Sequence, residues 1–352
     1  MKLINTVDAE GTVLCHDITQ IIKGVTKDAV FRKGHVVTKE DIPVLLSVGK
    51  DQLYVWEKEK GILHENDAAE ILCQLCINEH MDRSQAKEGK IELTAACDGL
   101  LKVDNRGMKA VNGFGQMMIA SRHGNFPVKK GDKLAGTRII PLVIEEEKME
   151  AARQAAMAAT EGNSILKLMP FQHKKVGIVT TGNEVFYGRI KDTFTPVIED
   201  KMAEFDTEII GHDTWNDDDK KVTASILSMI QKGADVVVCT GGMSVDPDDK
   251  TPLAIKNTGA RIVSYGAPVL PGAMFLLAYY EVKDGDRPRT VAIMGLPGCV
   301  MYAKRTIFDL VLPRVMADDE VTAEDLASLG QGGLCLGCPV CTFPNCGFGK
   351  GY

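Results

Sequence analysis

The feature that most constrains the fold is a regular alternation of apolar runs and helix-like segments from residue 174 onwards. The predicted strands are "KVGIVTTGNEV", "TEIIGHDTW", "ADVVVCTGG" and "VAIMGLPG", and the predicted helices are "TPVIEDKMAEF", "KKVTASILSMIQKG", "KTPLAIKNTG" and "CVMYAKRTIFDLVLPRV". Strands that alternate with helices of this length indicate a parallel sheet wound by right-handed crossovers. We therefore predict an α/β domain with a three-layer, parallel-sheet architecture over residues 174–316.

The rest of the 352-residue chain divides into four further regions. Residues 1–86 are predicted as a mixed α+β region, and residues 87–146 as a small β-rich module whose apolar runs are split by turns. Residues 147–173 begin with an alanine-rich helix and are predicted to be a helical connector. Residues 317–352 form a tail that is rich in glycine and cysteine and has no helical or strand period.

Charge and hydropathy exclude two classes of partner. Lys and Arg number 41 against 48 Asp and Glu, a net charge of -7, and an acidic surface repels the phosphates of nucleic acid. No apolar stretch approaches the roughly 20 residues needed to span a bilayer, and the first residues lack the apolar run of a signal peptide. We expect a cytoplasmic protein that binds neither nucleic acid nor membrane.

Glycine turns follow the predicted strands. They are Thr181-Gly182-Asn183-Glu184, Gly241-Gly242 with Ser244, Gly295-Leu296-Pro297-Gly298, and Pro271-Gly272 in a separate turn. In a parallel sheet, ligands bind beyond the carboxyl ends of the strands, so we expect these turns to meet around one site. Glycine allows the backbone to approach a ligand closely, and exposed N–H groups can hold an anion.

Aspartates gather near the same predicted edge. Asp248 and Asp249 follow the second glycine turn, and Asp192 precedes another predicted helix. Clustered carboxylates beside an anion indicate a hard cation such as Mg²⁺ between them, which makes all three candidate catalytic residues. Because Asp is also favoured at helix N-caps, the capping interpretation stays open for each.

At these residues the chain resembles a known family. "TTGNEV", "ADVVVCTGGMSVDPDDKTP" and "MGLPG" resemble the molybdopterin-binding domain of molybdopterin molybdenumtransferases, molybdopterin adenylyltransferases and competence/damage-inducible proteins, over about residues 174–316. Thr181 to Glu184 match the family's T-G-[DN]-E turn, and Asp249 matches its downstream aspartate. Asp192 matches the aspartate of its D-S-N helix start, although Thr193 and Phe194 replace the following Ser-Asn.

The resemblance implies a protein of molybdenum cofactor biosynthesis that binds molybdopterin or its adenylate and assists molybdate insertion or nucleotide transfer. It implies Mg²⁺ at the aspartates, a homo-oligomer, and a molybdenum enzyme as a candidate partner. The residues implied to hold the pterin and its phosphate are Thr181, Gly182, Asn183, Glu184, Gly241, Gly242, Ser244, Pro271, Gly272, Gly295, Leu296, Pro297 and Gly298.

Several departures from the family favour other functions. The K-P-G-K turn of the transferases stands here as Leu270-Pro271-Gly272-Ala273, so both lysines are absent, and G-L-P-G continues as Cys299-Val300. The transferases' S-A-M-D-G-Y-A segment and their carboxyl-terminal β-module are also missing. Lysines stabilise anions and transferring phosphoryl groups, so their loss favours a non-catalytic cofactor carrier or insertion chaperone. A nucleotide pyrophosphatase like the competence/damage-inducible relatives is a third possibility.

The tail carries a separate signal. Cys335, Cys338, Cys341 and Cys346 have the spacing C-x₂-C-x₂-C-x₄-C. Four closely spaced thiols fit an iron–sulfur cluster or a tetrahedral Zn²⁺, and the two successive C-x₂-C steps are more typical of clusters. The alternative is a disordered, redox-reactive tail.

Overall fold

The computed structural model describes residues 2–22, 26–55, 60–244, 246–247, 249–282 and 289–351. The chain forms two compact units, and each is built from segments that are separate in the sequence. The first contains Met1–Ala96, Val103–Arg122 and Gly131–Lys167, and the second contains Cys97–Lys102, His123–Lys130 and Leu168–Tyr352. This division cuts across the five regions expected from the sequence, and the boundaries of those regions stay predictions.

The first unit begins with short elements around a small apolar cluster. They are β1 (Lys2–Asn5), a 3-10 turn (Thr6–Asp8), β2 (Ile18–Ile22), β3 (Thr26–Phe31), α1 (Asp41–Ser47) and β4 (Gln52–Val55). β1 pairs with β4 and β2 with β3, both antiparallel. Leu14, Ile18, Leu45 and Leu53 are almost wholly buried between these elements and form their core.

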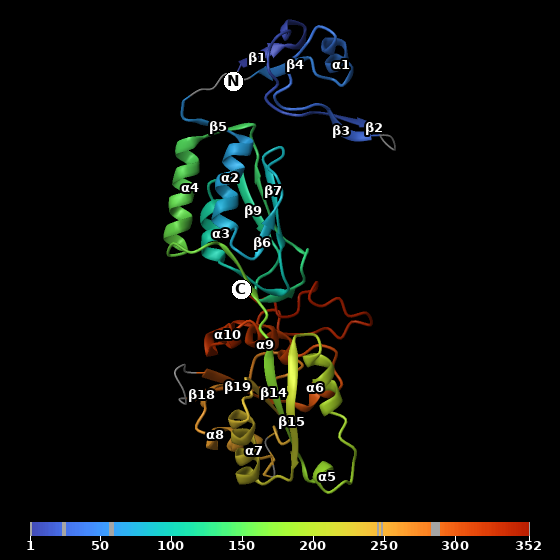
Figure 1. Cartoon of the computed structure of the whole chain (residues 1–352), viewed down its shortest axis with the longest axis vertical. Coiled ribbons are helices and arrows are strands. Elements are labelled where there is room, and N and C mark those ends of the chain that lie inside the picture. Colours follow the sequence, from blue (N-terminus) through green and yellow to red (C-terminus); the bar gives the residue numbers. More distant parts are fainter. Residues whose placement is uncertain are drawn as a thin grey trace. The chain divides into compact units, whose positions relative to one another are not determined.

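The remainder of the first unit is an antiparallel sheet with helices on one side. The strand order is β6 (Met81–Arg83), β7 (Lys90–Ala95), β11 (Lys133–Ile139) and β9 (Met117–Ser121), while β5 (Ile62–His64) pairs with β12 (Val143–Glu145). Helices α2 (Glu65–Cys76), α3 (Asn105–Asn112) and α4 (Glu146–Ala159) gather on one side of this sheet (Figure 1). Because α4 buries Met149, Ala152 and Ala156, it is part of this unit's core as well as a connection.

The second unit is centred on a six-stranded sheet. Its order is β15 (Thr207–Trp215), β14 (Lys174–Thr181), β16 (Val236–Thr240), β19 (Arg289–Leu296), β18 (Leu276–Val282) and β17 (Arg261–Tyr265). The first four strands are parallel, which confirms the predicted α/β sheet. The sequence analysis missed β17 and β18, which continue the sheet in antiparallel fashion.

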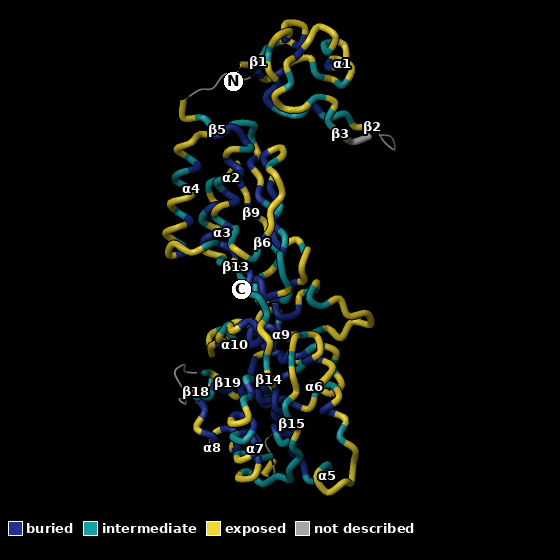
Figure 2. Tube along the Cα trace, viewed as in Figure 1, coloured by how far each residue is buried: buried dark blue, intermediate teal, exposed yellow. Residues whose placement is uncertain are grey.

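Helices cover both faces of this sheet and make three layers. Alternate residues of the central strands point to opposite sides, so Val236 and Val238 belong to one core cluster and Val237 to another. The first face is covered by α6 (Thr195–Met202) and α9 (Ile307–Met316), and the second by α7 (Asp219–Gln231) and α8 (Thr251–Asn257). Figure 2 shows the central strands as the buried part of this unit.

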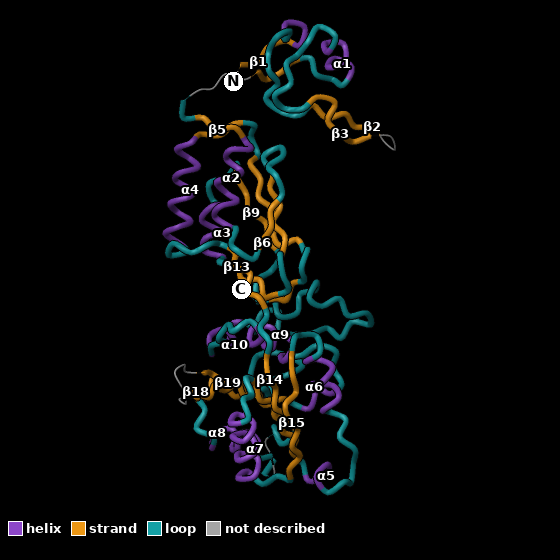
Figure 3. The backbone as a smooth tube through the Cα atoms, in the orientation of Figure 1, coloured by secondary structure: helices purple, strands orange, loops and turns teal. Residues whose placement is uncertain are grey.

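Shorter elements complete the second unit. They are α5 (Asn183–Phe186), a 3-10 turn (Gly298–Met301), α10 (Ala323–Ser328), and a small sheet in the order β10 (Phe126–Val128), β8 (Gly99–Val103) and β13 (Leu166–Pro170). After α10 the chain continues as loop (Figure 3). In the part of the chain that the structure describes, no helix is both long and apolar enough to cross a lipid bilayer.

Candidate functional site

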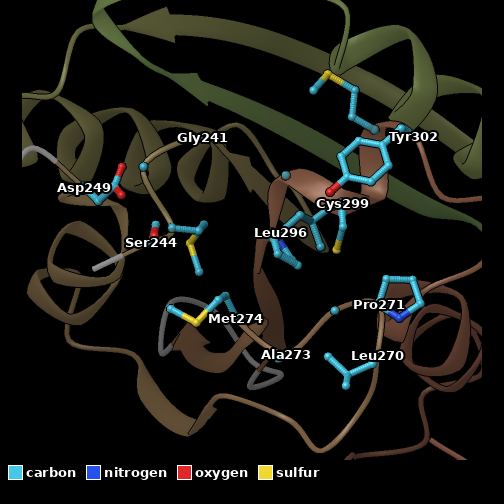
Figure 4. Close-up of a pocket in the computed structure, with 16 residues that line it drawn as sticks. Gly241, Ser244, Asp249, Leu270, Pro271, Ala273, Met274, Leu296, Cys299 and Tyr302 are labelled. Atoms are coloured by element: carbon cyan, nitrogen blue, oxygen red, sulfur yellow. The ribbon is translucent and has the colours of Figure 1, made fainter. Parts of the chain in front are cut away.

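A pocket of about 610 Å³ lies at the carboxyl edge of the parallel strands in the second unit. Three chain segments form its wall: the turn after β16, the turn before β18, and the turn after β19. The lining residues are Gly241, Gly242, Met243, Ser244, Asp249, Leu270, Pro271, Gly272, Ala273, Met274, Leu296, Pro297, Gly298, Cys299, Met301 and Tyr302. Figure 4 shows Asp249 and Ser244 on one side of the pocket, opposite Tyr302, Cys299 and Pro271.

The turn after β16 needs glycine at both of its first positions. Gly241 and Gly242 have φ angles of +83° and +55°, in the left-handed region that other residues rarely adopt. A Cβ atom at Gly241 would lie 2.0 Å from the carbonyl oxygen of Thr181, and one at Gly242 would lie 2.8 Å from the Thr251 hydroxyl. The turn therefore packs directly against the end of β14.

The turn before β18 is tied to helix α9. Gly272 has φ +132°, and a Cβ atom there would lie 2.4 Å from Cγ2 of Ile307. The backbone N–H of Ile307 also donates to the carbonyl oxygen of Pro271, with an N···O distance of 3.3 Å. Gly298 differs from these positions because nothing lies within 4 Å of the place its Cβ would take. One wall of the pocket is thus closely packed, while the wall at Gly298 is open.

The chemistry of the lining is apolar with few polar groups. Asp249 is the one acidic side chain among the described lining residues, and none of them is Lys, Arg or His. The Tyr265 hydroxyl donates to the carbonyl oxygen of Met243 at 2.9 Å, and this hydrogen bond ties the turn after β16 to β17. Burial raises the pKa of Tyr265, and the nearby charge of Asp249 raises it further. Among the described lining residues, negative charge on a ligand could be met by backbone N–H groups and by the hydroxyls of Ser244 and Tyr302.

Nine of the predicted site residues meet in this pocket. They are Gly241, Gly242, Ser244, Asp249, Pro271, Gly272, Leu296, Pro297 and Gly298. Five others do not line it: Thr181 ends β14, Gly182, Asn183 and Glu184 follow that strand, and Gly295 lies within β19. A Cβ at Gly295 would lie 2.6 Å from Sδ of Met243, so that position lets Met243 lie against the strand. Asp248 lies outside the described residues.

Asp192 does not line the pocket, and its carboxylate accepts hydrogen bonds from the turn that leads into α6, whose N-cap residue is Phe194. Its carboxylate accepts from the backbone N–H of Phe194 at 2.8 Å, and from the N–H and hydroxyl of Thr195 at 3.1 and 2.6 Å. Burial alone would raise the pKa of Asp192, but these hydrogen bonds outweigh it and hold the pKa below its ordinary value. The same Thr195 hydroxyl lies 3.2 Å from His212, beneath the strand ends.

The sequence analysis missed the apolar part of the pocket. Met243, Met274, Cys299, Met301 and Tyr302 all line it, and Tyr302 is 78% exposed. Each of them lies within four residues of a predicted glycine turn. That proximity was the available signal, but apolar side chains beside a turn are common in any core, so the pattern did not single them out.

The four tail cysteines line a second cavity of about 620 Å³ in the same unit. Cys335 and Cys346 are partly buried, whereas Cys338 and Cys341 are exposed. Within the described ranges, no group of three or more His, Cys, Asp or Glu side chains is placed to hold a metal ion. The expected Mg²⁺ and the expected tail metal therefore have no preformed site among these residues.

Comparison with known proteins finds family matches for two parts of the chain. Residues 177–317 match the family described as "Probable molybdopterin binding domain", and residues 3–57 match "Domain of unknown function (DUF8806)". A "CinA-like protein" of Mycobacterium tuberculosis is 34% identical over 77 residues, which are 22% of this chain and 18% of that protein. The chain thus aligns with less than a fifth of the length of such curated relatives.

Two solved structures resemble part of the chain. The "tungsten cofactor synthesizing protein MoaB from Pyrococcus furiosus" is 20% identical and matches 42% of this chain and 89% of its own, with a TM-score of 0.31. The "protein CinA with unknown function from Thermoplasma acidophilum" is 16% identical and matches 41% of this chain and 98% of its own, with a TM-score of 0.32.

Proposed function

We propose that this chain, whose residues 177–317 belong to the molybdopterin-binding family, binds molybdopterin or its adenylate and serves molybdenum cofactor biosynthesis. The observation that supports this is the convergence of three turns, separated in the sequence by up to about sixty residues, around one pocket of about 610 Å³. A pocket of this size is typical for a cofactor-sized ligand. Its apolar walls suit the flat pterin ring, and its glycine turns let a phosphate approach the backbone.

Asp249 is proposed to orient the ligand. Its carboxylate is an acceptor at the edge of an otherwise apolar pocket, and a pterin presents amino and ring N–H donors. The described residues do not form a Mg²⁺ site of their own, so this role is derived without a metal. The resemblance to the transferases would add a divalent ion here, held by Asp249 together with oxygens of the ligand, as Mg²⁺ often is.

The lining favours holding the cofactor over transferring a group to or from it. Group transfer develops negative charge, which enzymes meet with Lys, Arg or metal ions. None of the described lining residues is a cation, and Leu270 and Ala273 stand where the transferases carry lysine. We therefore propose a cofactor carrier or insertion protein first, and a transferase that depends on Asp249 second. The homo-oligomer and the molybdenum-enzyme partner stay proposals of the resemblance.

The test is the pterin content of protein purified without oxygen from a host that makes molybdenum cofactor. After oxidation, the fluorescent pterin is quantified per chain. We expect close to one pterin per chain for the wild type, a clear loss for Asp249→Asn, and no change for Asp246→Asn. Asp246 is the matched control because it is exposed in the same loop and does not line the pocket.

Two outcomes would change the proposal. A folded wild-type protein without pterin would overturn it, and hydrolysis of ADP-ribose-type substrates would then favour the pyrophosphatase. Turnover of molybdopterin-adenylate with molybdate would make the transferase the better interpretation. A normal pterin content in Asp249→Asn with turnover lost would assign Asp249 to the chemistry and not to binding.

A further inference from the structure

The second cavity of the second unit has no role in the proposed pterin site. It is lined by all four tail cysteines, by Lys304 and Arg305, and by Pro271 and Tyr302, which also line the first pocket. Its volume of about 620 Å³ lies within the usual range of small-molecule binding sites. Four thiols and two cations around one hollow are a chemically specific set.

The tail is fastened to the body of the unit. Leu270 donates its N–H to the carbonyl oxygen of Gly333, and Cys335 donates its N–H to the carbonyl oxygen of Leu270, both at 2.8 Å. At the far end, Gly349 donates to the carbonyl oxygen of Gly332 at 2.9 Å, and a Cβ at Gly349 would lie 2.4 Å from Leu310. The cysteine loop is therefore held at both ends.

Between these two anchoring points the four thiols differ in burial. Cys335 and Cys346 pack against the core cluster that contains Phe348, while Cys338 and Cys341 are exposed at the rim. Gly337 has φ +62° and nothing within 4 Å of its Cβ position, so the backbone between the first two cysteines has room to turn. Ligand binding would draw the two rim thiols toward the two that are anchored.

We propose that Cys335, Cys338, Cys341 and Cys346 together bind one iron–sulfur cluster of the [4Fe–4S] class in this cavity. Two successive C-x₂-C steps are typical of such clusters.

The charge of the cavity is suited to that group. Four thiolates leave a cluster with a net negative charge, which Lys304 on the lining offsets. Arg305 also lines the cavity, but its charge is already paired with Glu204 and Asp309. Lys304 is positioned by the tail itself, because its Nζ donates to the carbonyl oxygen of Pro339 at 3.1 Å. Arg305 is held by Asp309 at 2.8 Å and lies over the Phe343 ring, 5.2 Å from its centroid.

Uptake of the cluster needs no oxidant or reductant. A donor cluster that carries four small thiolate ligands exchanges them for the four cysteines. Each cysteine sulfur forms a bond to iron and gives up its proton, and each small thiolate leaves with that proton. The cluster keeps its oxidation state throughout.

The experiment loads the full chain, without oxygen, from a synthetic [4Fe–4S] cluster with small thiolate ligands, and then removes unbound iron. We expect about four iron and four sulfide ions per chain and a visible absorption that bleaches on reduction. Cys338→Ser and Cys341→Ser should each lose most of the iron, and both sites are exposed, so the fold should persist. Circular dichroism verifies the fold of each variant.

Cys97→Ser is the matched control. Its thiol is partly buried in the same unit and lines neither cavity. The proposal is overturned if the folded wild type takes up no cluster, if it binds one Zn²⁺ in preference to iron, or if the control loses as much iron as the rim variants. Because iron and sulfide are measured without reference to pterin, failure here is distinguishable from failure of the proposed function.

Discussion

Two of the cavities in the second unit have nearly equal volumes, about 610 and 620 Å³, but their walls are built in different ways. The first is shaped by backbone turns at strand ends, with left-handed glycines that press against neighbouring strands. The second is shaped by side chains of a loop that has no regular secondary structure. The shape of the first cavity therefore depends on the sheet, and the shape of the second depends on a few hydrogen bonds that hold the tail to Leu270.

The two cavities share two wall residues, Pro271 and Tyr302. They also share the segment that builds them, because Leu270 lines the first pocket and bonds to the tail through its backbone N–H and carbonyl groups. A substitution in the turn before β18 should therefore alter the lining of both cavities. A substitution in the turn after β16 should alter only the first cavity, and one in the cysteine loop only the second.

The largest contrast is expected in thiol reactivity. Burial raises the pKa of Cys76 and of Cys239 to about 12, so at pH 8 only about one molecule in ten thousand carries the reactive thiolate at each site. Cys338 and Cys341 are exposed, and alkylation of the cluster-free protein should modify them first. Mass spectrometry after a timed iodoacetamide pulse measures this. Equal labelling of Cys239 and Cys338 in folded protein would contradict the expected difference between the buried thiol and the exposed tail thiol.

The next effect separates closely packed and open glycines of the first pocket. Gly241→Ala should lower the free energy of unfolding by about 3 kcal/mol, because it combines a left-handed φ with a Cβ that would lie 2.0 Å from a carbonyl oxygen. Gly298→Ala should change it by less than about 0.5 kcal/mol, since its Cβ meets open space. Denaturant titration of both variants measures the difference, and similar values would refute it.

A third change should act on one cavity alone. Gly298→Leu places an apolar side chain in the open part of the first pocket and should reduce pterin affinity roughly tenfold or more, about 1.4 kcal/mol. Iron uptake by the tail should stay at the wild-type level, because Gly298 does not line the second cavity. Pterin and iron are measured on the same sample. A parallel loss of both would show that the cavities are not separable.

The smallest effect concerns Asp192, whose carboxylate caps the turn that leads into α6. Asp192→Ala should cost about 1 kcal/mol of stability near neutral pH, while Asp192→Asn should retain most of the capping. Because the pKa of Asp192 lies below its ordinary 3.8, its contribution is complete above that value and is lost as the pH falls through the lowered pKa. The difference in the free energy of unfolding between the wild type and Asp192→Ala should therefore become smaller at acidic pH. A difference that is constant down to pH 2 would argue against the charged cap.

The chain's own pattern determined the parallel core and the meeting of its glycine turns. Runs such as "VVVCTGG" are apolar on both faces and end in glycine, and parallel strands necessarily bring their carboxyl ends to one edge. For this reason we expected four glycine turns to meet at one edge; three of them line the pocket, and the turn from Thr181 to Glu184 does not. The four cysteines were equally visible, because their ligating potential is local in sequence.

Tertiary structure alone decided which residues face the pocket and which support it. Asp192 and Asp249 look alike in sequence. In the structure the Asp192 carboxylate accepts hydrogen bonds from the turn before α6, whereas Asp249 lines the pocket. Likewise β17, β18 and β19 pair in antiparallel fashion with their next neighbours in sequence, and the prediction missed the first two because no helix separates these strands. Tyr302 and Pro271 became part of two cavities only because the tail folds back onto Leu270, a contact between residues more than sixty positions apart.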